Sequence, residues 1–252
     1  MKYQAIIFDI DGTAVPNSED GVPSPKLIQA VRNAQKIIPV SVATGRPWYL
    51  AKPIVEKLGI TSLCVLSGGS QIIDPKAQKI VWEKLLSLEQ VEKIIDICRP
   101  LNLEIYFSDE TDPRDLKKEV VVDQKEKIIW IVNLTKEQTG DLEIRLSVVL
   151  NIQTHIVPDW IEGRFALTIN HSEATKKDAL KVLFEMLKVD PATVMAVGDS
   201  GNDLPLFEMA GYKVAMGNAT ADLKEKADYI TDSVDEDGLA KVIEQNIYKI
   251  KT

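Results

Sequence analysis

The chain has 252 residues, with 38 acidic and 30 basic side chains and a formal net charge of −8. This acidic balance argues against nucleic acid or an anionic membrane as the main partner. No apolar run reaches the roughly 18 residues that a membrane-spanning helix needs, and the N-terminus leads into a short strand rather than a signal peptide. The two cysteines, Cys64 and Cys98, form no C-x-x-C pair, so we expect buried, reduced thiols and a cytoplasmic protein.

The first part of the chain alternates short apolar strands with amphipathic helices. Strands are predicted over residues 3–8, 40–43 and 63–66, and helices over residues 25–37 and 48–58. This βαβαβ order is typical of a parallel, doubly wound sheet.

The pattern changes after a predicted hairpin. The middle of the chain reads as α+β: helices are predicted over 87–98 and 135–150, a loop over 108–116, and strands over 103–107, 119–122, 127–134, 152–157 and 164–169. Strand and helix alternate again from residue 175. We therefore predict an α/β fold with a Rossmann-like core at residues 1–82 and 168–252. An α+β cap domain at residues 83–167 is inserted into it.

A pair of acids follows the first strand, in the sequence Asp9-Ile10-Asp11-Gly12-Thr13. Gly12 lets the chain turn sharply, so both carboxylates and the Thr13 hydroxyl are expected at the carboxyl end of a strand. In open α/β sheets, ligands bind at that edge. An ordinary Asp-Gly turn is the alternative for this segment taken alone.

Three further polar segments follow predicted core strands. Thr44-Gly45-Arg46-Pro47 reads as a helix start with Thr44 as its N-cap, and such a start also offers an anion site. Ser67-Gly68-Gly69 is expected to be a tight turn. The segment 198–203 (Gly-Asp-Ser-Gly-Asn-Asp) places two acids four residues apart, which a helix cap alone explains poorly.

The acids of these segments would form one cluster with Asp9. Carboxylates that lie so close together need a cation, and hard oxygen ligands suit Mg²⁺. Lys176 and Lys177 open the helix before the last acidic segment, and one of them could balance the cluster and hold a phosphate oxygen. Solvated lysines are the alternative. A carboxylate nucleophile, a second acid, a hydroxyl, a lysine and Mg²⁺ together are what phosphoryl transfer through an aspartyl-phosphate requires.

With these residues in place, the chain resembles the haloacid dehalogenase superfamily of phosphohydrolases. It is most similar to the type IIB members with a large inserted cap, such as Cof-like, sucrose-phosphatase-like and phosphoglycolate phosphatase-like proteins. The motifs matched are Asp9 to Thr13, Thr44, Lys176 and residues 198–203, in the family order. Lys177 stands where relatives usually have Gly, which leaves open which lysine holds the phosphate.

The resemblance implies a role for each matched residue. Asp9 would take the phosphoryl group, and Asp11 would protonate the leaving alcohol and then activate water. Thr44 and Lys176 would hold the phosphoryl oxygens. The expected phosphate site also includes Thr13, Gly45 and Asn202. The expected Mg²⁺ site comprises Asp9, Asp11 through its backbone carbonyl, Asp199 and Asp203.

The expected function is therefore Mg²⁺-dependent hydrolysis of a small phosphorylated metabolite, such as a sugar phosphate or phosphoglycolate, by a monomer or homodimer. A phosphomutase of the same fold and a silent phosphate-binding regulator are the alternatives. Candidate substrate contacts are Arg46, Arg114, Arg145, His155, Trp160 and Arg164. Function at the level of the substrate depends on the inserted domain, whose contacts the sequence does not place.

Overall fold

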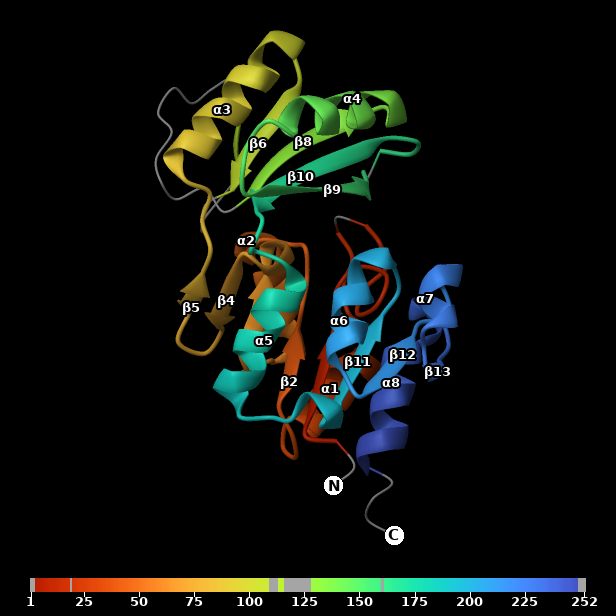
Figure 1. Cartoon of the computed structure of the whole chain (residues 1–252). Helices are drawn as coiled ribbons and strands as arrows, with labels where there is room; N and C mark the ends of the chain where they lie inside the picture. Colours follow the sequence, from red (N-terminus) through yellow and green to blue (C-terminus); the bar gives the residue numbers. More distant parts are fainter. Residues whose placement is uncertain (1–2, 19, 109–112, 116–127, 160, 249–252) are drawn as a thin grey trace. The chain divides into compact units, whose positions relative to one another are not determined.

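The structure is a computed structural model that describes residues 3–18, 20–108, 113–115, 128–159 and 161–248, without the side chains of 108, 113–115 and 248. The chain divides into two compact units. One consists of residues 1–82 with 176–252, and the other of residues 83–175. The colours in Figure 1 show that the first unit is made from both ends of the sequence.

The first unit is built on a five-stranded parallel sheet in the order β13-β12-β11-β1-β2. Its strands are β1 (Ala5–Phe8), β2 (Val40–Val42), β11 (Val194–Gly198), β12 (Tyr212–Ala215) and β13 (Tyr229–Ile230). A parallel bridge between Ala43 and Val65 brings β3 (Cys64–Leu66) alongside β2. A small sheet then continues from β3 through β4 (Gln71–Asp74) to β5 (Lys79–Glu83). The strand β1, which carries the first acidic motif, therefore lies at the centre of the sheet.

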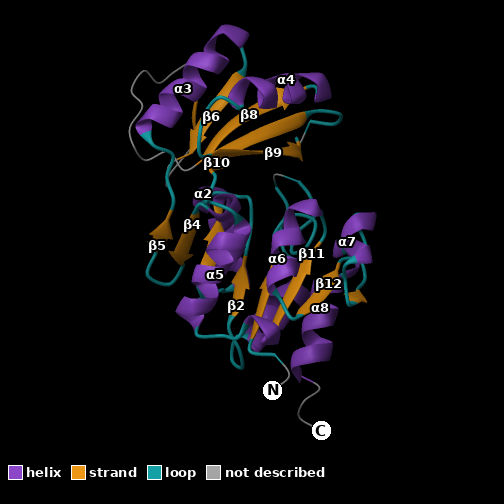
Figure 2. Cartoon of the chain, viewed as in Figure 1, coloured by secondary structure: helices purple, strands orange, loops and turns teal. Residues whose placement is uncertain are grey.

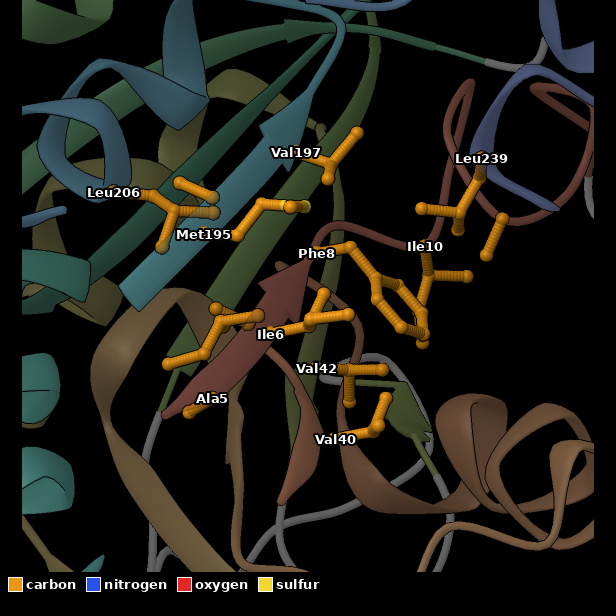
Figure 3. Close-up of a cluster of buried hydrophobic side chains, with 14 of the residues drawn as sticks. Ala5, Ile6, Phe8, Ile10, Val40, Val42, Met195, Val197, Leu206 and Leu239 are labelled. Atoms are coloured by element: carbon orange, nitrogen blue, oxygen red, sulfur yellow. The ribbon is translucent and has the colours of Figure 1, made fainter. Parts of the chain in front are cut away.

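Helices cover this sheet and complete the predicted α/β core (Figure 2). They are α1 (Pro25–Ala34), α2 (Trp48–Leu58), α5 (Lys176–Leu187), α6 (Leu204–Met209), α7 (Ala221–Glu225) and α8 (Gly238–Ile243). Helix α5 packs against α6, and α1 packs against α2 and α8. Figure 3 shows Leu206 of α6 and Leu239 of α8 on opposite sides of β1. The predicted doubly wound parallel sheet is confirmed.

The second unit is a five-stranded antiparallel sheet in the order β7-β6-β8-β10-β9. Its strands are β6 (Glu104–Ser108), β7 (Pro113–Asp115), β8 (Ile128–Leu134), β9 (Ile152–Pro158) and β10 (Phe165–His171). The helices α3 (Leu88–Cys98) and α4 (Lys136–Leu146) lie on the same face of this sheet (Figures 1 and 2). Each begins with a capping box, at Ser87 and Thr135, which satisfies backbone N–H groups of its first turn.

Several element boundaries differ from those predicted. The second boundary between the units falls after residue 175 rather than 167, because residue 168 lies inside β10, which pairs with both β8 and β9. The predicted loop over 108–116 contains β7, which pairs with β6. Helix α4 ends at Leu146, four residues early, as the chain turns towards β9 through Asn151 at a φ of 58°. The strand predicted over 119–122 lies outside the described residues. Among the helices that the structure describes, none is both long and apolar enough to span a bilayer.

Candidate active site

The first acidic motif begins where β1 ends. The Asp9 N–H still donates to the Val197 carbonyl at 3.1 Å, which continues the pairing of β1 with β11. The chain then turns at Gly12, with a φ of 69°, and the N–H groups of Ala14 and Val15 both donate to the Ile10 carbonyl. Glycine suits this position because residues with a Cβ rarely adopt a positive φ. The predicted sharp turn after the strand is confirmed.

The second acidic segment follows β11 and is held by one of its own carboxylates. Asp203 Oδ2 accepts hydrogen bonds from the N–H groups of Asp199 (3.0 Å) and Ser200 (3.3 Å). The Asp203 side chain is fully buried against Gly198, where an added Cβ would lie 2.7 Å from Oδ2. Asp203 therefore fixes the loop that presents Asp199.

Carboxylates from the two segments meet in one cluster. Oxygens of Asp9, Asp199 and Asp203 all lie within 4.8 Å of one another. Burial, reinforced by repulsion from Asp203, raises the pKa of Asp9 well above its usual range. The same two causes raise the pKa of Asp199 to about 7. At Asp9 and Asp199, nearby positive charge therefore does not offset burial and repulsion between the acids.

One lysine reaches this cluster from the first turn of α5. Lys176 Nζ donates to Asp203 Oδ1 at 2.9 Å and lies 3.5 Å from Asp9 Oδ1. Burial acts to lower the pKa of Lys176, but Asp203 and Asp9 outweigh it and raise that pKa. Lys177, in contrast, is exposed and pairs with Glu208 at 2.7 Å. Of the two lysines between which the sequence left the choice open, Lys176 lies at the cluster.

The cluster has the properties of a site for a hard divalent cation. Asp9 Oδ1 is buried and accepts no hydrogen bond within the described part of the chain. Asp199 is half-buried, and its Oδ1 accepts a long hydrogen bond from Thr13 Oγ1, at 3.4 Å. An all-oxygen donor set with two acids of raised pKa fits Mg²⁺, which would supply the missing charge. The carboxylate of the fourth expected ligand, Asp11, pairs with Arg46 instead.

The Asp11 carboxylate is held by an arginine. Arg46 Nε and Nη2 donate to its two oxygens at 2.9 and 2.6 Å, and Nη2 also donates to the Ser18 carbonyl at 3.0 Å. The Arg46 side chain is only 6% exposed. Arg46 was predicted as a substrate contact or as the partner of a core acid, and in this structure its guanidinium pairs with the core acid Asp11. The Asp-Gly turn and the arginine after Thr44 are the sequence signals for this pair, since they end neighbouring strands.

The remaining phosphate-site candidates are placed in different ways. Thr44 is buried between β2 and α2, and its Oγ1 accepts from the Arg46 N–H at 3.1 Å. The prediction that Thr44 caps the helix is wrong, because α2 begins at Trp48 after Pro47, whose fixed φ suits a helix start. Gly45 is exposed beside it. Asn202 is also exposed, and its Oδ1 accepts from Ser200 Oγ at 2.7 Å.

The candidate substrate contacts that the structure describes in the second unit lie on its strands, helix and turn. Arg164 is half-buried at the turn between β9 and β10, where its N–H donates to the Ile161 carbonyl. Arg145 pairs with Asp141 within α4, and His155 is exposed on β9. Trp160 and the side chain of Arg114 lie outside the described residues.

The chain is similar to known proteins over almost its whole length. The family model described as haloacid dehalogenase-like hydrolase matches residues 6–243. A 5-amino-6-(5-phospho-D-ribitylamino)uracil phosphatase of Bacillus subtilis is 32% identical over 96% of this chain and 95% of its own. A phosphoglycolate phosphatase of Methanosarcina acetivorans is 26% identical over 97% and 96%, respectively. A haloacid dehalogenase-like hydrolase structure from Bacteroides thetaiotaomicron superposes with a TM-score of 0.82, at 26% identity over 96% of this chain and 99% of that one. The chain therefore belongs to the haloacid dehalogenase-like hydrolases, as a phosphatase that acts on phosphoric monoesters.

Proposed function

We propose that the chain hydrolyses a small phosphomonoester, such as a sugar phosphate or phosphoglycolate, with Mg²⁺ and through a covalent intermediate on Asp9. The observation that carries this proposal is the buried Asp9 carboxylate, which lies beside Lys176 and two further acids at the carboxyl edge of a parallel sheet. The names of the relatives support a small phosphorylated substrate and differ in which one.

Two displacements at phosphorus complete the reaction. In the first, an Asp9 oxygen bonds to phosphorus while the bond to the leaving oxygen breaks, and Asp11 gives that oxygen its proton. In the second, Asp11 takes a proton from water, whose oxygen attacks phosphorus and releases Asp9 and phosphate. Lys176 and Thr44 hold the phosphoryl oxygens during both steps.

We assign the acids different roles at the cation site. When bound, Mg²⁺ would neutralise the acids and the phosphoryl oxygens. Asp9, the Asp11 carbonyl and Asp199 are the expected ligands. Asp203 already accepts hydrogen bonds at both oxygens, from Lys176 and from the loop N–H groups. We therefore assign Asp203 the orientation of Lys176 and of the Asp199 loop.

Two other functions would use much of the same site. A phosphomutase would return the phosphoryl group from Asp9 to a second hydroxyl of the substrate and release no phosphate. A silent phosphate-binding regulator would bind without turnover, but it has no need for an acid such as Asp11 that is held in place by Arg46. The release of inorganic phosphate separates hydrolysis from both.

The decisive experiment measures phosphate release from an aryl phosphate and from a panel of sugar phosphates, phosphoglycolate and a ribityl phosphate. It is run with Mg²⁺ and with a chelator, on the native chain, on Asp9→Asn, and on Asp190→Asn as a control, since Asp190 precedes β11 and Asp199 follows the other end of that strand. We expect release that needs Mg²⁺, survives in Asp190→Asn and is lost in Asp9→Asn. A folded native chain that releases no phosphate from any of these substrates would refute the proposal.

A further inference from the structure

We propose that Asn218, which no motif of the sequence analysis includes, is a positioning residue of the cation site. It follows β12, so it lies at the same edge of the sheet as the two acidic segments. It fixes the position of the turn at Gly12 relative to the loop of Asp199. This inference rests on the proposed function only in that the acids bind Mg²⁺.

Asn218 makes two hydrogen bonds that fix the orientation of its amide. Its Nδ2 donates to the Gly12 carbonyl at 2.8 Å, and its Oδ1 accepts from the Val234 N–H at 2.9 Å. A backbone N–H can only donate, so it must face the amide oxygen. The amide nitrogen is thereby directed to Gly12, and the exposed side chain is held at both ends.

The segment that carries Asn218 is bonded to the other acidic loop. The Met216 N–H donates to the Gly198 carbonyl and the Thr220 N–H to the Asp199 carbonyl, each at 2.9 Å. One stretch of five residues therefore contacts both loops from which the cation ligands come. Of these three bonds to the two loops, the one from Asn218 to Gly12 is made by a side chain, so a substitution can remove it without changing the backbone.

The turn at Gly12 packs closely against Asp199. A Cβ placed on Gly12 would lie 2.2 Å from Asp199 Oδ2. The Gly12 turn also carries the Asp11 carbonyl, and Mg²⁺ demands near-ideal geometry from its ligands. A shift of the turn relative to Asp199 would change the distance between these two ligands. The loss of a residue that orients metal ligands typically costs about 10- to 100-fold in metal affinity.

The test titrates the metal-free protein with Mg²⁺ by calorimetry, which needs no substrate. Asn218→Ala removes both bonds, and Asn218→Asp keeps the acceptor for Val234 but sets a carboxylate oxygen against the Gly12 carbonyl. Asn246→Ala is the matched control, since Asn246 Nδ2 also donates to a backbone carbonyl, that of Val242, at 2.9 Å. We expect both Asn218 variants to bind Mg²⁺ about tenfold or more weakly, and the control to bind it as the native chain does.

The outcomes separate this inference from the proposed function. Native-like Mg²⁺ affinity in Asn218→Ala, or tighter binding in Asn218→Asp, would overturn the inference even if the native chain is an active phosphatase. A lowered Tm with unchanged affinity would likewise reduce Asn218 to a structural role and overturn it. A native chain that binds Mg²⁺ but releases no phosphate would refute the proposed function alone, because the titration still decides the role of Asn218.

Discussion

Replacing Arg46 with alanine is expected to slow catalysis most for substrates whose leaving group needs a proton. Arg46 contacts the Asp11 carboxylate through two N–H groups. Its loss would free Asp11 to rotate, while the parts that bind phosphate stay in place. A substrate that leaves as an alkoxide needs the proton of Asp11, whereas a nitrophenolate leaves without one.

The size of the effect follows from the contacts. Hydrogen bonds to a charged group contribute about 1.5 to 3 kcal/mol. Because the Asp11 side chain is 28% exposed and water can replace part of the interaction, we take about 2 kcal/mol, the lower part of that range. That corresponds to a loss of roughly 30-fold in kcat, since about 1.4 kcal/mol is a factor of ten. The contribution of general acid catalysis, about 10² to 10⁴, sets the upper limit.

The assay compares kcat and KM for a sugar phosphate and for p-nitrophenyl phosphate in Arg46→Ala, Arg46→Lys and the native chain. Arg32→Ala is the control, because Arg32 donates to a backbone carbonyl on the surface of the same unit. We expect the roughly 30-fold loss with the sugar phosphate, a loss of less than about threefold with the aryl phosphate, and little change in KM. Equal losses on both substrates would refute the reasoning, and so would a rise in KM without a change in kcat.

Four further predictions concern the acid cluster and its lysine. In the metal-free chain the pKa of Asp199 is raised to about 7 from an ordinary 3.8, so Mg²⁺ must displace a proton at lower pH. Its apparent affinity should fall up to about tenfold per pH unit below about 7, and calorimetry that shows no pH dependence would contradict this. Without metal, the folded chain holds the Asp199 proton more tightly than the unfolded chain does. The contribution of Asp199 to stability is therefore greatest below about pH 4 and is lost as the pH rises to about 7. The Tm of the metal-free chain should fall across that window, and a rising Tm would contradict this prediction. Gly12→Ala forces a Cβ against Asp199 at a residue with a positive φ. Urea unfolding should show that the free energy of unfolding falls by about 1 to 3 kcal/mol, and Mg²⁺ should bind more weakly. Unaltered Mg²⁺ binding would rule out the close approach of Gly12 to Asp199. Lys176→Met should lower kcat by about 100-fold or more. Lys177→Met removes a surface pair with Glu208 and should leave kcat near the native value. A large loss of kcat in Lys177→Met with little loss in Lys176→Met would assign the phosphate to Lys177 instead.

The core of the fold could be predicted because its elements have strong local signals. The strand β1 is a short apolar run that ends in an Asp-Gly turn, and α2 is stopped by Gly59 in the left-handed conformation. The edge at which parallel strands end then determines which distant residues meet. That rule brings Asp9 and Asp199 together without knowledge of their contacts, whereas Lys176 opens α5 and does not follow a strand of the parallel sheet.

Other features depend on tertiary contacts that no local pattern reports. The short strand β7 carries Pro113 and has no alternation of apolar residues, and it exists because β6 offers a partner. The burial of Arg46 follows from the position of Asp11 and of the Ser18 carbonyl, which are 35 and 28 residues away. Asn218 gave no signal of its own. Its place at the end of β12 could have been noticed once that strand was assigned to the parallel sheet.

The central position of β1 has a consequence for how the chain is made. The strand emerges first during synthesis, but the partner on one of its sides, β11, is encoded almost 190 residues later. Until that segment emerges, one edge of β1 and its flanking apolar side chains lack their native cover, which is the situation in which nascent chains associate wrongly. The second unit is continuous in sequence and has its own hydrophobic core, so it can fold while the first unit waits. We therefore expect pulse-labelled hydrogen exchange during refolding to protect β8 and β10 before β1.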